Sequence, residues 1–217
     1  LLKENGKLMK YDLVIANYPF SRDWDSELGA KDPFNRYPFG IPASKGTADY
    51  AFIQEMYSHL NDTGRAAIIS SQGILFREKK ELPIRKNFID IENDLIETVI
   101  ALPKNLFYGT GIPACIILLN KNKPLKRKGK IQFIYAAKDF EDLKKRDKLR
   151  DMDIKKIVSA VKGFKNIEKY SHIADSKEIE ENEFNLNIPR YIDTYEPEEP
   201  IDLKKGFDNL MSLETEQ

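Results

Sequence analysis

The sequence predicts an α/β fold built on a doubly wound, mainly parallel sheet, and three observations support this. Short apolar runs rich in β-branched residues alternate with segments of helical periodicity. The first three of these runs are separated by connections long enough to hold a crossover helix, as parallel strands require. Of the 217 residues, 41% are hydrophobic, which is enough for a full core. We therefore expect a folded globular protein.

The first predicted strand is followed by a long loop and a helix. Residues 11–16 (YDLVIA) form an apolar run that stops at Asn17 and Pro19, and we expect a buried strand there. Residues 21–46 are rich in Asp, Pro, Gly and Phe without a sustained period, which indicates an ordered loop with a functional role. Apolar residues then recur at helical spacing over 48–60, so we predict an amphipathic helix.

The following segments continue the alternation. Residues 65–70 and 95–102 are apolar runs typical of buried strands, and a helical pattern over 81–91 separates them. Two more apolar runs, 114–119 and 130–136, are joined by a short basic segment. We predict that these last two strands form a hairpin at the far edge of the sheet.

The composition of the chain changes near residue 137. Residues 1–137 contain the strands and helices described so far, and we assign them to one α/β domain. Residues 138–217 are highly charged, with helical periodicity and a final segment that contains several prolines. We therefore place a boundary near residue 137.

The charge balance argues against a general affinity for polyanions. The chain has 35 basic and 35 acidic side chains, so no global field draws it onto nucleic acid. Any contact with nucleic acid must be local or shared with a partner. Basic residues gather at 121–130 and 144–150, where they could contact phosphates. A solvated charged surface is the alternative that we favour for both clusters.

Cysteine usage and hydropathy point to a cytoplasmic protein without a membrane span. Cys115 is the single cysteine, so it cannot form an internal disulfide, and a reducing compartment fits. No stretch approaches the roughly 18 apolar residues that cross a bilayer. His59 and His172 have no neighbours at metal-ligand spacing, and we predict no metal site.

The sharpest chemical feature is the tetrapeptide Asn17-Tyr18-Pro19-Phe20 after the first strand, where open α/β sheets form their ligand crevices. The exocyclic amine of a nucleobase is a poor nucleophile because its lone pair is delocalised. If the Asn17 side-chain oxygen and the Tyr18 carbonyl accept its hydrogens, the nitrogen can pyramidalise and face a methyl donor. Pro19 would orient the preceding carbonyl, and Phe20 would offer a face on which a flipped base stacks.

A second candidate loop follows the third strand. Residues 103–113 hold two adjacent aromatics, Phe107 and Tyr108, and either ring could form the opposite wall of a base pocket. Ordinary turns with an aromatic in the core are the structural alternative for this loop and for residues 17–20. Residues 109–114 match a dinucleotide fingerprint, but a strand rather than a helix follows, so we reject that function.

With these motifs in view, the chain resembles a known family, the modification subunits of type I restriction-modification systems, which are N6-adenine DNA methyltransferases. The matching motifs run in family order along nearly the whole chain. They are DLVIANYPFS (12–21), ADYAFI (48–53), GRAAIIS (64–70), QGILFR (72–77), LPKNLFYGTGIPACIILL (102–119), LRDMDI (149–154) and NLNIPRYIDT (185–194). The family's tetrapeptide usually has Pro where this chain has Tyr18, but the carbonyl at that position is kept.

The resemblance implies a fold and an activity. The fold would be the second half of a Rossmann-like, S-adenosylmethionine-dependent methyltransferase sheet, with an added hairpin and a charged helical C-terminal region. The activity would be methyl transfer from S-adenosylmethionine to a flipped adenine in double-stranded DNA, with residues 17–20 catalytic and Phe107 or Tyr108 contacting the base. The family's Gly-rich cofactor motif has no counterpart in residues 1–10. We therefore expect an incomplete cofactor site, a sheet open along its first strand, and no activity of this chain alone.

The resemblance also implies partners. In such systems a specificity subunit reads the DNA sequence and a restriction subunit can join the complex; residues 138–217 are our candidate for subunit docking. Two other functions stay open. The chain could be a non-catalytic assembly or scaffold component of the same complex. It could also methylate a glutamine side-chain amide in a protein, because the Asn-x-Pro-aromatic chemistry suits any planar amide.

Overall fold

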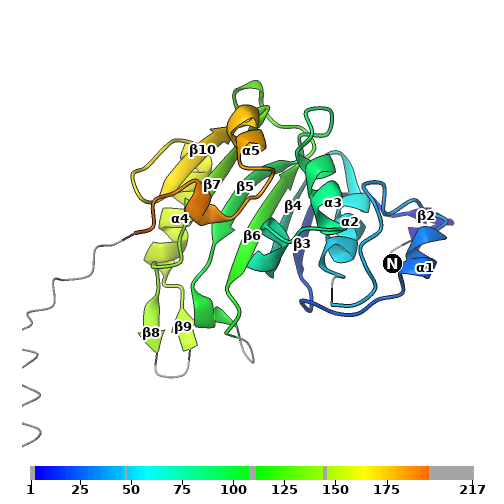
Figure 1. The fold of residues 1–217 in the computed structure, drawn as a ribbon, viewed down its shortest axis with the longest axis horizontal. Helices are drawn as coiled ribbons and strands as arrows, with labels where there is room; N and C mark the ends of the chain where they lie inside the picture. The colour runs from blue at the N-terminus through cyan, green and yellow to red at the C-terminus, as the bar shows by residue number, and fades with distance from the viewer. Residues whose placement is uncertain (1–2, 47, 108–110, 144–145, 196–217) are drawn as a thin grey trace, which may run out of the picture.

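A six-stranded mixed sheet forms the centre of the molecule (Figure 1). The computed structural model describes residues 3–46, 48–107, 111–143 and 146–195. The strands, in spatial order, are β10 (Ser171–Asp175), β7 (Lys130–Tyr135), β5 (Ile96–Ala101), β6 (Ala114–Asn120), β4 (Leu60–Ser71) and β3 (Tyr11–Asn17). β3, β4, β5 and β7 run in one direction, whereas β6 and β10 run in the opposite direction. The predicted α/β architecture is confirmed, but the sheet is mixed rather than mainly parallel.

The two strands predicted to form a hairpin, β6 and β7, do not pair with each other. β6 inserts between β4 and β5, and β7 pairs with the other edge of β5. The connection 121–129 therefore crosses one end of β5, a span of about 10 Å or two strand spacings. Asp94 holds this connection, because its carboxylate accepts from the Lys123 ammonium at 2.6 Å and from the Gly129 amide at 2.9 Å. The hairpin prediction is wrong because β5, buried at every position, takes a partner on each edge.

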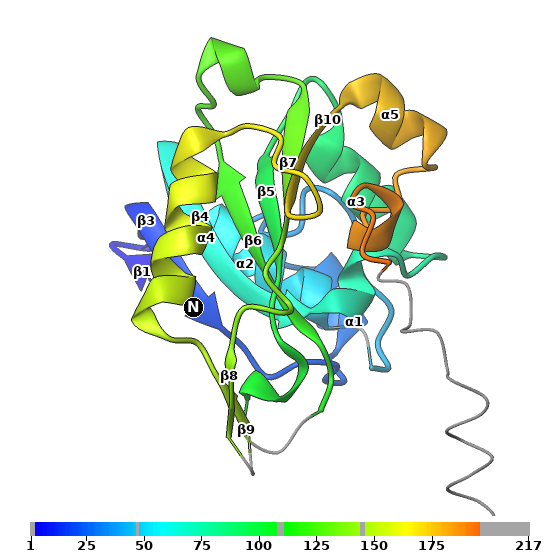
Figure 2. The same cartoon turned by 90° about the vertical axis from the view of Figure 1, so that its left-hand side faces the viewer.

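Helices cover the two faces of the sheet unequally (Figure 2). The described helices are α1 (Ser26–Ala30), α2 (Asp49–Ser58), α3 (Glu81–Ile89), α4 (Asp151–Gly163) and α5 (Ser176–Glu181). α2, α3 and α5 lie on one face and contribute to the larger of two apolar clusters, with Ile53 and Phe88 at its centre. α4 lies on the other face and packs Ile157 and Ala160 against β5 and β7. The predicted helices over 48–60 and 81–91 correspond to α2 and α3.

Short elements occupy the periphery. The segment 21–46, expected as an ordered loop, contains α1, whose first amides donate to the Asp25 carboxylate at 3.0 and 3.1 Å. Asp25 thus supplies the N-cap that a short helix needs. Two small hairpins complete the described part. They are β1 (Lys3–Glu4) with β2 (Lys7–Leu8), and β8 (Glu141–Leu143) with β9 (Arg146–Lys148).

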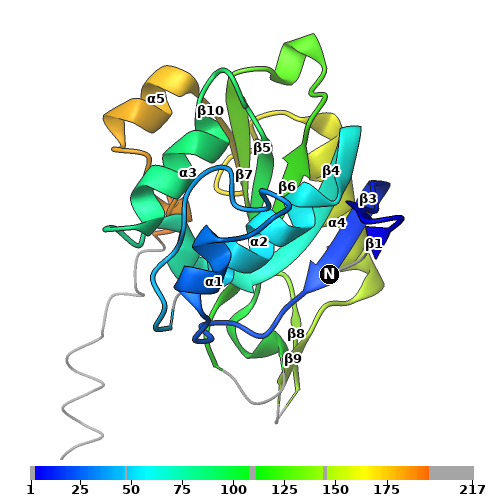
Figure 3. The ribbon, with the colours of Figure 1, turned by 90° about the vertical axis from the view of Figure 1, so that its right-hand side faces the viewer.

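β3 lies at an edge of the sheet and is open along it (Figure 3). It pairs with β4 on one side, and no strand among the described residues pairs with its other side. Leu13 and Ile15 are 59% and 76% exposed on the face where α4 covers only the more distant strands. The predicted strand over residues 11–16 forms, but the prediction that it is buried is wrong, because none of its residues is buried on either face. The expectation of a sheet open along its first strand agrees with the structure.

Residues beyond the composition change at 137 join the same sheet and core. β10 pairs antiparallel with β7, and α4 packs on the sheet. Tyr191 stacks on Phe133 of β7 with ring centroids 3.8 Å apart, and Leu186 and Ile188 are buried in the larger cluster. The composition change therefore does not coincide with a gap in the packing of the described residues. Whether residues 138–217 dock a subunit stays a proposal.

The structure also bears on the predictions for Cys115 and for a membrane span. Cys115 is buried in β6, as its apolar surroundings predict, and burial raises the pKa of its thiol. Among the helices of the described residues, none is long and apolar enough to cross a membrane.

Candidate active site

The tetrapeptide 17–20 lies where β3 ends, beside the end of β4. Asn17 is the last residue of β3 and pairs in register with Ile69 of β4. Because side chains alternate along a strand, Asn17 shares its face with Ile15, and it is exposed. The structure therefore places an amide side chain at the open carboxyl end of the sheet, the position that the sequence predicts for it.

Tyr18 anchors the turn in the core. It is 5% exposed, its ring stacks on Phe52 of α2 at a centroid distance of 4.9 Å, and its hydroxyl is hydrogen bonded to the Ser70 hydroxyl at the end of β4. Burial raises the pKa of Tyr18 well above its ordinary value, so the phenol stays neutral. The side chain is thus a structural anchor. The backbone carbonyl is then the group that Tyr18 can offer to a substrate.

Two aromatic rings from separate loops meet beside this turn. Phe20 and Phe107 are half-buried, with centroids 6.5 Å apart and planes at 85°. Phe20 also meets the Tyr18 ring edge-on at 5.6 Å. The structure therefore brings the first candidate loop and the second candidate loop together. Tyr108 lies outside the described residues, so the choice between it and Phe107 stays open.

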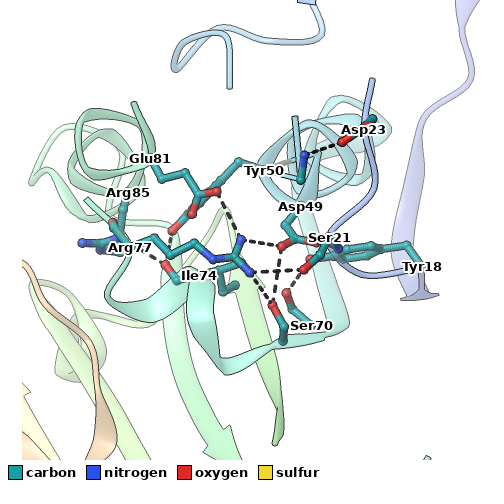
Figure 4. A network of polar contacts seen from close by, with 12 residues as sticks. Tyr18, Ser21, Asp23, Asp49, Tyr50, Ser70, Ile74, Arg77, Glu81 and Arg85 are labelled. Atoms are coloured by element: carbon teal, nitrogen blue, oxygen red, sulfur yellow. Dashed lines mark hydrogen bonds and ion pairs between the residues drawn. The ribbon is translucent and has the colours of Figure 1, made fainter. Parts of the chain in front are cut away.

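A buried polar network lies directly behind the turn (Figure 4). The Ser21 amide, which follows Phe20, donates to Asp49 Oδ1 at 2.9 Å. Asp49 is fully buried in the first turn of α2, and its Oδ2 accepts from Arg77 Nη1 at 2.7 Å. Arg77 Nη2 also reaches the hydroxyls of Ser71 at 3.3 Å and Ser21 at 3.4 Å. One guanidinium thus connects the end of β4, the start of α2 and the turn.

The charges in this network shift each other's pKa values. Burial opposes the charge of Arg77, but hydrogen bonding to Asp49 and the charge of Glu81 outweigh it and raise the pKa of Arg77. Burial raises the pKa of Glu81, and Arg77, 3.3 Å away, offsets only part of that rise. Arg85, on the next turn of α3, is buried and donates to the backbone carbonyls of Ile74 and Arg77. Arg77 is therefore held both through its side chain and through its backbone.

Sequence reasoning did not single out Asp49, Ser70 or Arg77 as site residues. Asp49 and Arg77 occur in the motifs ADYAFI and QGILFR, which contribute to the family resemblance. The motifs gave no indication that these two residues meet, because 28 positions separate them in the chain. A search for oppositely charged residues within separate matching motifs could have found the pair.

A cavity of about 470 Å³ lies beside α2 and the 21–46 loop, with an apolar lining that includes Trp24 and Phe52. Its charged side chains are paired with one another: Arg36 bonds to Glu55 at 2.6 Å, and Glu55 also bonds to His59 at 3.2 Å. The charged side chains that line this cavity therefore already have partners, which argues against it as the cofactor site. A search of the described residues also finds no group that could hold a metal ion.

Three of the basic residues of 121–130 have partners within the fold. Lys123 is buried on Asp94, as described above, and Lys121 Nζ donates to the Leu60 carbonyl at 3.2 Å. Arg127 stacks over Phe164 at 4.4 Å and donates to the Val161 carbonyl at 3.2 Å. Lys121 adjoins the start of β4 and Lys123 lies next to the start of β5, whereas the candidate turn adjoins the end of β4. Lys121, Lys123 and Arg127 are therefore held within the fold, and phosphate contact by the other basic residues of the cluster stays a prediction.

Comparison with known proteins gives consistent matches over nearly the whole chain. The family model described as N-6 DNA methylase matches residues 1–200. The MjaVIII type I restriction enzyme methylase subunit of Methanocaldococcus jannaschii is 39% identical over 95% of this chain and 36% of its own length. The HindI methylase subunit of Haemophilus influenzae is 36% identical over 96% of this chain and 48% of its own length. The chain thus spans between about a third and a half of these relatives.

Solved structures share the fold. The type I restriction-modification methyltransferase subunit of Streptococcus thermophilus matches 87% of this chain and 40% of its own length, with 40% identity and a TM-score of 0.78. A class I S-adenosylmethionine-dependent methyltransferase from Listeria monocytogenes matches 74% of this chain with 17% identity and a TM-score of 0.50. The second likeness concerns the fold alone.

Proposed function

The chain belongs to the N-6 DNA methylase family, and from that premise we propose that it carries the catalytic half of a DNA adenine N6-methyltransferase. The proposal rests on the geometry of the turn after β3. Asn17 is exposed at the carboxyl end of the sheet, and the next residue offers a carbonyl while its own ring is anchored in the core. An amide oxygen and a neighbouring carbonyl oxygen are the two acceptors that an amine with two hydrogens requires.

The chemistry follows from these two acceptors. The adenine amine is planar because its lone pair is shared with the ring, which makes the nitrogen a weak nucleophile. When the Asn17 side-chain oxygen and the Tyr18 carbonyl accept both hydrogens, the nitrogen pyramidalises and its lone pair is freed for attack. The same acceptors stabilise the positive charge that develops on the nitrogen. The methylated nitrogen is positively charged and loses one of its protons to water after the transfer, so no side chain of unusual pKa is needed as a base.

The substrate in this proposal is an adenine flipped out of double-stranded DNA. A base inside the duplex cannot reach a crevice at the end of a sheet, so it must leave its stack. Phe20 offers a face on which the flipped base stacks. Phe107 supplies a second apolar wall, with its ring centroid 6.5 Å from that of Phe20. Tyr108 is the alternative for that second wall.

The rest of the catalytic site comes, in this proposal, from polypeptide outside the chain. β3 has a free hydrogen-bonding edge among the described residues, and the chain spans 36% and 48% of two relatives. A further strand on β3 would extend the sheet, and S-adenosylmethionine, the methyl donor of the family, would bind chiefly to that added part. We propose a specificity subunit and a restriction subunit as protein partners, with residues 138–217 as the docking region.

The proposal is tested with the chain co-produced with the polypeptide that supplies the rest of the sheet. Labelled methyl transfer to N6 of adenine in duplex DNA is measured for the wild type, for Asn17→Ala and for the control Asn122→Ala, an exposed Asn in the connection after β6. We expect Asn17→Ala to lose at least about 100-fold in kcat, as removal of one aimed polar group typically does, and Asn122→Ala to match the wild type.

Other outcomes point to the alternative functions. Retention of more than a tenth of the activity by Asn17→Ala would rule out its role as an acceptor. An assembled complex in which the wild type transfers no methyl group would favour the scaffold function. Label recovered on glutamine of a protein rather than on DNA would favour amide methylation.

A further inference from the structure

We propose that Asp49, Ser70 and Arg77 are positioning residues that clamp the turn 17–21 from both sides. The catalytic consequence rests on the proposed function, whereas the clamp is a property of the fold. One arm holds Tyr18 through Ser70, and the other holds Ser21 through Asp49 and Arg77.

The downstream arm holds a backbone conformation that the chain would otherwise avoid. Ser21 has a φ of +54°, in the left-handed region where residues other than glycine are strained. Its amide donates to the fully buried Asp49 carboxylate at 2.9 Å. A hydrogen bond to a buried charge is among the stronger ones available to a backbone amide. The carboxylate therefore holds the chain in the sharp bend that directly follows Phe20.

Arg77 holds that carboxylate in place. Its Nη1 lies 2.7 Å from Asp49 Oδ2, and its Nη2 contacts the Ser21 and Ser71 hydroxyls. A Cβ at Gly73 would come within 2.8 Å of the Arg77 guanidinium, so glycine at that position leaves room for it. Without Arg77, a buried carboxylate would lose its counter-charge, a state that proteins avoid by protonation or rearrangement.

The upstream arm fixes the other end of the turn. The Tyr18 hydroxyl is bonded to Ser70, which is fully buried next to Ser71 at the end of β4. Consecutive residues of one strand therefore support both arms, because Ser71 contacts Arg77 and Asp49. The Tyr18 carbonyl lies at the start of the segment that the two arms enclose, and Asn17 directly precedes it.

Catalysis is sensitive to the aim of these two groups. A displacement of about 1 Å in an aligned catalytic group costs on the order of 100-fold in rate. None of the three positioning residues touches the substrate in the proposed geometry. Loosening either arm should therefore lower kcat while the binding of DNA and of cofactor stays nearly constant.

The first test compares Arg77→Gln with a matched control in the complete methyltransferase. The control is Lys123→Gln, which removes a buried ion pair of 2.6 Å with Asp94 just before β5, at the other end of the sheet. We expect Arg77→Gln to lower kcat 10- to 100-fold with the DNA and cofactor Kd values within threefold of wild type. Lys123→Gln should lower Tm and leave kcat within twofold. A kcat of Arg77→Gln within twofold of wild type would overturn the positioning role.

The second test needs no activity. Hydrogen exchange of the Ser21 amide, measured by NMR in the 217-residue chain, should be at least tenfold faster in Arg77→Gln than in wild type, and unchanged in Lys123→Gln. Equal exchange in Arg77→Gln and wild type would overturn the clamp. Asp49→Asn keeps one acceptor oxygen and the side-chain volume, and it should speed exchange of the Ser21 amide and lower kcat, each by three- to tenfold. This variant decides the question if Arg77→Gln does not fold. If the wild type transfers no methyl group, the proposed function fails while the exchange result still decides the clamp.

Discussion

At the scale of single residues, Tyr18 shows how an unusual side chain can replace a proline. In the family's usual tetrapeptide a proline ring restricts the backbone next to the catalytic Asn. Here Tyr18 is buried against Phe52 and bonded to Ser70, so packing restrains the same backbone position. The carbonyl that the proposed chemistry needs is therefore held by tertiary contacts rather than by a covalent ring.

The contribution of that anchor can be measured in the chain by urea unfolding. We expect Tyr18→Phe to lower the free energy of unfolding by about 1–2 kcal/mol, because the buried Ser70 hydroxyl loses this hydrogen-bond partner. The double variant with Ser70→Ala should cost less than the two single changes added together, since neither partner is then left behind. Additive effects would show that the bond contributes nothing of its own.

At the scale of elements, β3 combines a free edge with an apolar exposed face. Exposed strand edges pair with other chains, and apolar side chains beside such an edge strengthen the association. Leu13 and Ile15 lie on the uncovered face next to Asn17. The surface that a completing partner would cover therefore also makes the chain prone to self-association when no partner is present.

A charge on this face should suppress that self-association. We expect Ile15→Lys to shift the chain toward the monomer in sedimentation velocity and to weaken co-purification with the polypeptide that completes the sheet. Ile91→Lys is the control, because Ile91 is 79% exposed but lies in the loop between α3 and β5. Equal sedimentation of Ile15→Lys and wild type would exclude this face as an association surface.

At the scale of the whole molecule, the described residues form one packed body in spite of the change in composition near residue 137. β10 extends the sheet beyond β7, and residues after α5 return to the larger apolar cluster. Tyr191 illustrates this return: its ring stacks on Phe133, and its hydroxyl donates to the Asn185 carbonyl at 2.7 Å. A charged composition with few apolar residues can therefore still contribute to a core, provided that those few are buried.

The C-terminal part should accordingly stabilise the part of the fold that contains the candidate turn. We expect Tyr191→Ala to lower the free energy of unfolding of the chain by about 3–4 kcal/mol, as loss of a buried aromatic does. Tyr195→Ala, at a residue that is 69% exposed, should change it by less than about 0.5 kcal/mol. If both variants unfold like the wild type, residues after α5 are dispensable for the fold.

Local patterns in the sequence determined the family and the position of the candidate turn. The motifs predicted N6-adenine methyltransferase relatives, and the N-6 DNA methylase match over residues 1–200 confirms that resemblance. Periodicity and strand-ending residues placed Asn17 at the end of the first strand and located α2, α3 and the five strands from β3 to β7. These features depend on residues close together in the chain, so the sequence displays them directly.

Only the tertiary structure decided which distant segments meet. The insertion of β6 beside β5, the exposure of one face of β3, the return of Tyr191 to the core and the Asp49–Arg77 pair all depend on long-range packing. The apolar pattern of a strand indicates which residues favour burial, but not which element packs against them. An ion pair between residues 28 positions apart produces no periodic pattern in the sequence. The chemistry of the turn was therefore visible in its residue types, whereas its support became visible only once β4, α2 and Arg77 converged behind it.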